Sequence, residues 1–203
     1  MNKFLGNQKP FSVRNMAKVA ILAAFASIIY LLEFNLPFFP AFYKLDLSEI
    51  VILIGGFAMG PWQAVVIELV KMTLNLIVNG TITAGVGEVS NFILGCSFVI
   101  PACLIYRRNK YKKSAVKGMI VGTVSLTVLG ALLNYFALIP AYVALAGFPM
   151  DTIIGMANSV NPAVTSLETL VLFATIPFNL FKGVFCSLVT ALLYKRISPI
   201  LHI

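Results

Sequence analysis

Long apolar stretches separated by short polar turns are the feature that most limits how this chain can fold. The stretch from Leu167 to Tyr194 contains only two charged residues, Glu168 at its start and Lys182 deep inside it. Over the whole sequence, 60% of residues are hydrophobic, 11% are charged and the mean hydropathy is +0.95. Apolar stretches of about 20 residues are long enough to cross a bilayer as helices. The sequence therefore predicts an integral membrane protein and excludes a soluble globular domain.

The spacing of these stretches predicts an all-α membrane protein of six transmembrane helices, forming one transmembrane domain over residues 1–203. Prolines and aromatic residues in the first connection, from Asn35 to Asp46, predict a structured outer loop. The connection from Ala146 to Thr165 is expected to hold a short interfacial helix. The first stretch is too long for the apolar part of a signal peptide and is interpreted as a helix. The expected helices are 15–34, 48–59, 62–78, 86–106, 115–145 and 166–194.

The positions of the charged residues predict the orientation. Basic residues flank one side of the predicted membrane, whereas none of the seven acidic residues falls there. Lys and Arg are retained on the cytoplasmic side of membrane proteins, so both termini are expected in the cytoplasm of a multi-pass cell-membrane protein. No basic, aromatic-rich face suggests nucleic-acid binding. The basic side collects Lys3, Lys9, Arg14, Lys18, the cluster at 107–117, Lys195 and Arg196.

Lys182 is the most informative single residue, because an ammonium at bilayer depth is costly unless it has a partner. Asn179 lies one helical turn earlier and projects from the same face. Asn134 lies in the outer half of the fifth stretch, so the three side chains could meet in an apolar pocket open to the outside. Such a pocket suits a flat heteroaromatic molecule with a hydroxylated tail. The alternative is that Lys182 only forms an ion pair with a carboxylate on a neighbouring helix.

Two further features are a pair of charged residues inside an apolar stretch and a glycine-rich turn between two stretches. Glu68 and Lys71 are one turn apart and are predicted to neutralise each other in the bundle interior. The glycines of the turn from Asn79 to Glu88 allow a backbone to approach a ligand closely, but the turn has no phosphate-loop ending.

The sequence contains no motif that indicates an enzyme. The single histidine, His202, is near the C-terminus, and neither a zinc-protease helix nor a nucleophile elbow is present. Three cysteines fall in apolar stretches at spacings that fit no zinc site, so they are expected as free, buried residues. We expect no enzyme, no metal site and no cofactor. The cysteines are Cys96, Cys103 and Cys186.

Several motifs together resemble the riboflavin-binding S components of energy-coupling-factor (ECF) vitamin transporters, the RibU family, over essentially the whole chain. No single motif is decisive, but their order relative to six helices is specific. The motifs are residues 33–40 (EFNLPFFP), 44–49 (KLDLSE), Gly60-Pro61, 85–88 (GVGE), 134–136 (NYF) and 177–183 (PFNLFKG).

The resemblance implies a substrate-binding subunit of an ABC-type transporter that captures riboflavin outside the cell. Its partners would be a transmembrane coupling protein and two ABC ATPases, with Ala20 and Ala24 forming the docking motif for the coupling protein. Whether flavin mononucleotide (FMN) also binds is left open. By resemblance, the ligand-binding residues are Leu45, Asp46 and Leu47 in the first loop, Gly85, Val86 and Gly87 in the turn, and Asn134, Asn179 and Lys182.

Other functions are consistent with parts of the sequence. An S component for another vitamin, such as thiamine, would share most of these features. A stand-alone membrane enzyme lacks a nucleophile and metal ligands. A purely structural membrane protein would have no use for a costly intramembrane lysine.

Overall fold

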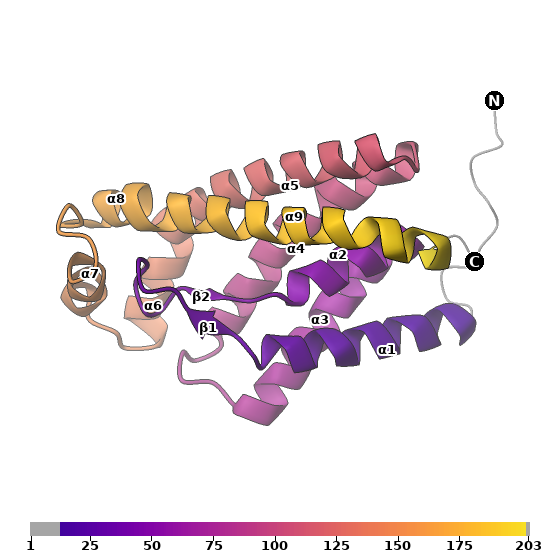
Figure 1. Ribbon diagram of the computed structural model, residues 1–203. Coiled ribbons are helices and arrows are strands. Elements are labelled where there is room, and N and C mark those ends of the chain that lie inside the picture. The colour runs from indigo at the N-terminus through magenta and orange to yellow at the C-terminus, as the bar shows by residue number, and fades with distance from the viewer. Residues whose placement is uncertain (1–12, 202–203) are drawn as a thin grey trace.

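The computed structural model describes residues 13–201, which form a bundle of helices with one small antiparallel hairpin (Figure 1). Lys3, Lys9 and His202 lie outside these residues. The helices are α1 (Val13–Tyr30), α2 (Ser48–Met59), α3 (Pro61–Asn79), α4 (Val86–Arg108), α5 (Lys112–Leu133), α6 (Ile139–Leu145), α7 (Met150–Asn158), α8 (Leu167–Leu170) and α9 (Ile176–Leu201). The π-helical segments are η1 (Asn134–Leu138) and η2 (Val171–Thr175), and the strands are β1 (Phe34–Asn35) and β2 (Lys44–Leu45).

Four of the helices are long and apolar enough to cross a membrane, which agrees with the expected membrane protein. Two apolar helices, α1 and α2, are shorter. A count of six spanning helices therefore stays a prediction. The four long helices are Pro61–Asn79, Val86–Arg108, Lys112–Leu145 and Leu167–Leu193.

The first helix is shorter than predicted, because the chain leaves the helix after Tyr30 and enters the hairpin. Phe34 pairs with Leu45 and Asn35 with Lys44 in antiparallel register. A salt bridge between Lys44 Nζ and Glu33 Oε1 joins the two sides of the hairpin at 2.5 Å. The predicted helix is thus wrong at residues 31–34, where the chain leaves α1 and enters the hairpin.

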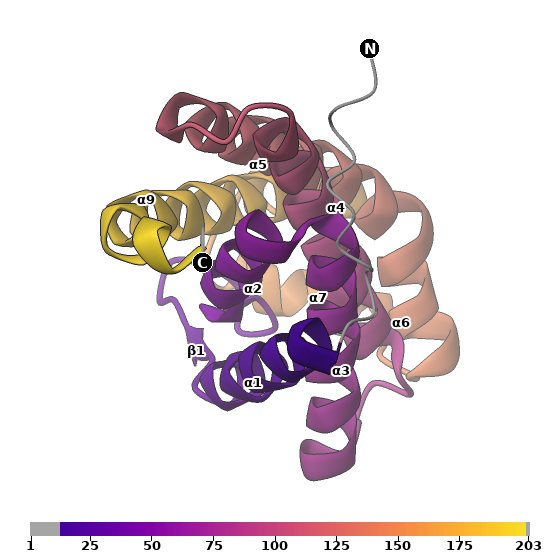
Figure 2. The same ribbon diagram turned by 90° about the vertical axis from the view of Figure 1, so that its right-hand side faces the viewer.

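A short helix, α2, lies in the middle of the bundle with α1, α3, α4 and α9 around it (Figure 2). It has only 12 residues, most of them buried and apolar. At about 1.5 Å per residue such a helix cannot reach both ends of the bundle. Its N-terminus therefore begins in the interior and brings the polar residues around Ser48 into the protein.

Two of the predicted long helices contain a π-helical turn, and each turn is followed by a proline. Pro140 comes two residues after η1, and Pro177 comes two residues after η2. Proline has no N–H to donate and clashes with the carbonyl four residues earlier, so a wider turn relieves the conflict. Each predicted helix therefore continues through the proline, but a wider turn separates its two regular parts.

The two ends of the bundle differ in their connections. The start of α1, the turn between α4 and α5 and the end of α9 lie at one end, and the hairpin, the α3–α4 turn and α7 lie at the other (Figure 1). The short helix expected between the fifth and sixth stretches is confirmed as α7. It packs on a small apolar cluster that includes Ile139, Ile153 and Leu170. This end therefore has a covering layer over the ends of the long helices.

Candidate functional site

A cavity of about 660 Å³ opens at the end of the bundle that carries the hairpin. Cavities of this size accommodate a vitamin-sized molecule. Its lining comes from α1, the hairpin, α3, α4, α5, η1, α6, α7 and α9, so it depends on the whole fold. Polar lining residues are Tyr30, Glu33, Tyr43, Lys44, Asp46, Asn75, Asn79, Thr83, Glu88, Ser90, Asn91, Asn134, Tyr142, Asn179 and Lys182.

The three intramembrane residues predicted from the sequence all line this cavity. Asn134 is held by a hydrogen bond from its Nδ2 to the Gly130 carbonyl, 2.8 Å away and one turn earlier on α5. Gly130 also faces the Asn179 amide so closely that a side chain there would collide with it. The missing side chain of Gly130 therefore lets the Asn179 amide of α9 pack closely against α5, at the residue whose carbonyl accepts from Asn134 of η1.

Lys182 has a carboxylate neighbour, as its position in the membrane demands. Its Nζ lies 3.9 Å from Asp46 Oδ2, whereas Asp46 Oδ1 accepts a hydrogen bond of 2.7 Å from the Ser48 N–H. Burial alone would raise the pKa of Asp46, but the ammoniums of Lys71 and Lys182 and the Ser48 N–H outweigh it and lower that pKa. Lys182 thus both faces the cavity and neighbours a carboxylate, which here comes from a loop.

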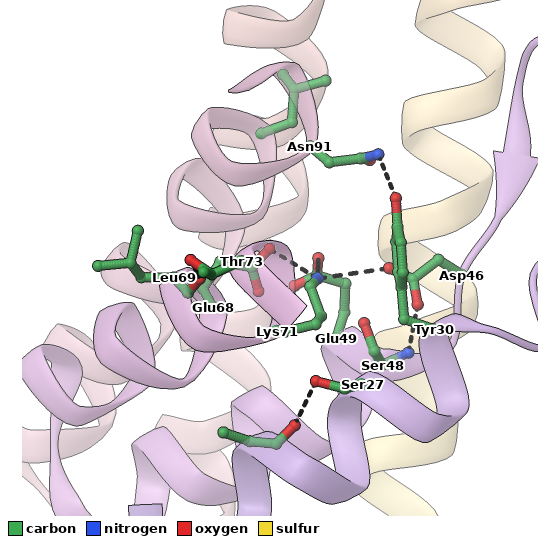
Figure 3. A network of polar contacts seen from close by, with 12 residues as sticks. Ser27, Tyr30, Asp46, Ser48, Glu49, Glu68, Leu69, Lys71, Thr73 and Asn91 are labelled. Atoms are coloured by element: carbon green, nitrogen blue, oxygen red, sulfur yellow. Dashed lines mark hydrogen bonds and ion pairs between the residues drawn. The ribbon is translucent and has the colours of Figure 1, made fainter. Parts of the chain in front are cut away.

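The predicted Glu68–Lys71 pair is confirmed, with Lys71 Nζ 2.7 Å from Glu68 Oε1. It belongs to a larger cluster, because Lys71 Nζ also lies 3.4 Å from Glu49 Oε1 and 3.6 Å from Asp46 Oδ2. Figure 3 shows the Lys71 ammonium between Glu68 on one side and Asp46 on the other. Asp46 and Glu49 are almost completely buried although Asp46 lies in a loop. They are buried because α2 begins inside the bundle.

The hairpin contributes an aromatic wall to the cavity. Tyr43 stacks on Phe178 of α9 with ring centres 4.9 Å apart, and Phe39 meets the same ring edge-on at 5.3 Å. The Tyr43 hydroxyl lies 2.6 Å from Thr175 Oγ1. These contacts attach the tip of the hairpin to the helix that carries Asn179 and Lys182.

The structure brings five of the nine predicted ligand-binding residues to the cavity: Asp46, Gly87, Asn134, Asn179 and Lys182. The other four do not line it. Leu45 and Val86 are buried in the protein, and Leu47 packs against the apolar core. Gly85 adopts the left-handed conformation, with φ of 85°, before the first turn of α4. Its role there is to shape the turn that places Gly87.

Other polar cavity residues were not found from the sequence. Asn75 and Asn79 continue the face of α3 that carries Glu68 and Lys71, at helical spacing. Tyr30 accepts a hydrogen bond of 2.7 Å from the Asn91 amide. The recurrence of amides at helical spacing within an apolar helix is the signal that would have identified the α3 residues.

Ala20 and Ala24 are exposed on α1, away from the cavity. Ala23 and Ala26, on the same helix, face the core instead and are fully buried. The small-residue surface at Ala20 and Ala24 is therefore exposed on the described part of the chain. The three cysteines are free, with Cys103 and Cys186 buried and Cys96 half-buried.

Known proteins resemble this chain over nearly its full length. Residues 14–194 match the family described as ECF transporter, substrate-specific component. A protein named riboflavin transporter RibU from Staphylococcus aureus is 31% identical over 93% of this chain and 92% of its own length. One named riboflavin transporter FmnP from Bacillus subtilis is 28% identical, covering 92% of this chain and 93% of its own.

A solved structure has the same fold. It is described as the S component of a bacterial ECF transporter, and it aligns with a TM-score of 0.71 at 30% identity. The alignment covers 93% of this chain and 97% of the other. These likenesses describe a transporter component, so the expectation that the chain is not an enzyme is confirmed by its relatives. Together with the cavity inside a helical membrane bundle, they show that the chain belongs to the family of substrate-specific components of ECF transporters.

Proposed function

We propose that this chain captures riboflavin on the outer side of the cell membrane and presents it for ATP-driven uptake. The cavity is the observation that carries this proposal. Its amides at Asn134 and Asn179 offer paired donors and acceptors for carbonyl and imide groups, and Lys182 offers a cation. Phe178 and Tyr142 supply flat apolar surface for an aromatic ring system. The relatives named as riboflavin transporters support the same ligand.

The proposed orientation places the cavity outside and both termini in the cytoplasm of a multi-pass cell-membrane protein. The exposed basic residues at the α4–α5 turn, among them Arg107, Arg108 and Lys113, lie at the end of the bundle opposite the hairpin. Such residues favour the cytoplasmic side. Transport by this chain requires a transmembrane coupling protein and two ATPases, and the exposed Ala20–Ala24 surface supports helix docking there. In this proposal riboflavin is the transported cargo, and the protein has no resident cofactor.

The direct test is to purify the protein in detergent from riboflavin-replete cells and to measure flavin absorbance and fluorescence after desalting. Wild-type protein should retain flavin in a quenched state. Lys182→Ala and Asn179→Ala should lose it while keeping their helix content, because each removes a polar group that faces the cavity. Lys113→Ala is the matched control, since its side chain is exposed at the α4–α5 turn.

A wild-type protein that neither retains flavin nor quenches added riboflavin would contradict the proposed ligand. Thiamine and other vitamins would then be tested with the same variants. Riboflavin bound equally well by Lys182→Ala and Asn179→Ala would instead show that the ligand occupies a different site.

A further inference from the structure

Lys182 has unused hydrogen-bonding capacity. Its ammonium carries three N–H donors, yet it donates no hydrogen bond to any residue between 13 and 201 and is 8% exposed. Its charged neighbour, Asp46, lies at 3.9 Å, which is too long for a hydrogen bond. Because Lys182 lines the cavity, these donors are available to a ligand there.

A second ammonium, that of Lys71, also lies near Asp46. Oδ2 of Asp46 lies 3.6 Å from Lys71 Nζ and 3.9 Å from Lys182 Nζ, and it accepts no hydrogen bond. Its other oxygen is fixed by the Ser48 N–H. Two ammoniums thus attract the same carboxylate oxygen from nearly equal distances.

Lys71 is held in place by two buried carboxylates. It is fully buried, does not line the cavity, and is held by Glu68 at 2.7 Å and by Glu49 at 3.4 Å. The ring of Tyr30, which does line the cavity, lies 5.1 Å from its Nζ. Both carboxylates find space over Gly95, where a methyl group would come within 2.9 Å of Glu49 Oε1. Lys71 is thus a buried charge next to two cavity residues, Tyr30 and Asp46, as Figure 3 shows for its contact with Asp46.

We propose that Lys71 is a positioning residue for ligand binding: it draws Asp46 away from Lys182 and so keeps the donors of Lys182 free for the ligand. This inference rests on the proposed riboflavin function. Without Lys71, Asp46 would pair directly with Lys182, and a ligand would have to break a buried charge-assisted hydrogen bond before binding. Lys71 then acts on the ligand without touching it.

The test must separate this role from simple charge balance, because removing Lys71 alone leaves buried carboxylates unpaired and threatens folding. The triple variant Lys71→Met/Glu49→Gln/Glu68→Gln removes the cation together with two carboxylates. Each new side chain has a shape similar to that of the residue it replaces. The double variant Glu49→Gln/Glu68→Gln keeps Lys71. Lys113→Met is the matched control for a lysine-to-methionine change at an exposed site. Riboflavin dissociation constants come from flavin fluorescence quenching, and folding from helix content and the thermal unfolding midpoint.

We expect the double variant to bind riboflavin about as tightly as wild type. The triple variant should fold and bind roughly tenfold to a hundredfold more weakly, the scale of one charge-assisted hydrogen bond. Adding Asp46→Asn to the triple variant should recover much of the affinity, because the competitor for Lys182 is gone. Loss of a merely structural charge would not be repaired in this way.

Equal affinity in the double and triple variants would overturn the inference. So would a weakened triple variant that Asp46→Asn fails to repair. A wild-type protein that does not bind riboflavin would refute the proposed function and this inference with it, whereas either of the other outcomes refutes the inference alone.

Discussion

Asp46 is charged and yet almost completely shielded from water, so its environment decides its protonation. Burial alone would raise its pKa, but Lys71, Lys182 and the Ser48 N–H bring the pKa below the ordinary value. A carboxyl whose folded-state pKa is lowered stabilises the protein above its unfolded pKa and loses that contribution as pH falls through the folded pKa.

This sign gives a pH prediction for Asp46→Asn. The wild-type protein should have the higher thermal unfolding midpoint, by a constant amount from pH 7 down to about pH 5, and the difference should shrink below about pH 4. Thermal unfolding in detergent across this range, followed by helix content, measures it. A difference that already shrinks near pH 6 would mean that the Asp46 pKa is raised instead.

The sequence predicted part of the site at this scale. Lys182, Asn179 and Asn134 could be identified because polar side chains in apolar helices are costly and helical spacing places them on defined faces. The partner of Lys182 could not be identified. Asp46 is separated from it by 136 positions (182 − 46) and reaches it only because α2 is short and begins inside the bundle. No local pattern encodes that contact.

At the scale of elements, the loop of the hairpin is joined to the last long helix through its side chains. Tyr43 of its loop forms a hydrogen bond with Thr175 of η2 and stacks on Phe178 of α9. A neutral hydrogen bond contributes about 0.5–1.5 kcal/mol net. Losing it should make the hairpin open more often while the rest of the bundle is unaffected.

Tyr43→Phe should therefore release riboflavin about two- to tenfold faster, since it keeps the stacked ring and removes only the hydroxyl. Stopped-flow measurement of flavin fluorescence after dilution gives the release rate. Tyr135→Phe is the matched control, because it removes a hydroxyl bonded to Glu168 outside the cavity. Equal release from Tyr43→Phe and wild type would show that the hairpin is not held by this bond.

The helices themselves were largely predictable, and their irregular parts were not. Apolar length and flanking charges gave the six segments within a few residues at most ends. The hairpin has only two residues in each strand, too few for an alternating pattern, and its pairing is fixed by contacts across the loop. The prolines at 140 and 177 were visible signals for the π-helical turns, because each conflicts with a regular helix.

At the scale of the whole molecule, the charges around the cavity predict which flavin it prefers. The lining contains three carboxylates, Glu33, Asp46 and Glu88, and two ammoniums, Lys44 and Lys182. Glu33 is paired with Lys44, and Asp46 lies between the two buried lysines. Glu88 has no cation among the described ion pairs, and it accepts hydrogen bonds from Thr81 and Thr83.

A phosphate group adds about −1.5 to −2 charges at neutral pH, so FMN should bind more weakly than riboflavin. One like charge about 10 Å away at an effective dielectric constant of about 20 costs roughly 1.7 kcal/mol, or more than tenfold in affinity. Glu88→Gln should narrow this gap, and the control Glu168→Gln, outside the cavity, should not. Competition titrations of both flavins measure it, and equal affinity for FMN and riboflavin in wild type would contradict the prediction.

The exposed small-residue surface of α1 gives a prediction for assembly. Ala20→Leu/Ala24→Leu should leave riboflavin binding intact, because both residues lie away from the cavity. It should reduce recovery of the coupling protein on co-purification from cells that express the complete transporter, since larger side chains prevent close helix packing. Ala137→Leu is the control, because Ala137 is exposed on η1. Undiminished recovery would place the docking surface elsewhere.

The two π-helical turns also determine which sequence changes this molecule can tolerate during evolution. Each holds one residue more than a regular turn, and deleting that residue would rotate the helix beyond it by about 100° relative to the helix before it. In the last long helix this would turn the connection from α7 away from the amide and ammonium groups of α9 that line the cavity. Changes of length near η1 and η2 should therefore be rare among descendants of this chain, whereas the exposed part of the connection between α7 and α8 is free to diverge.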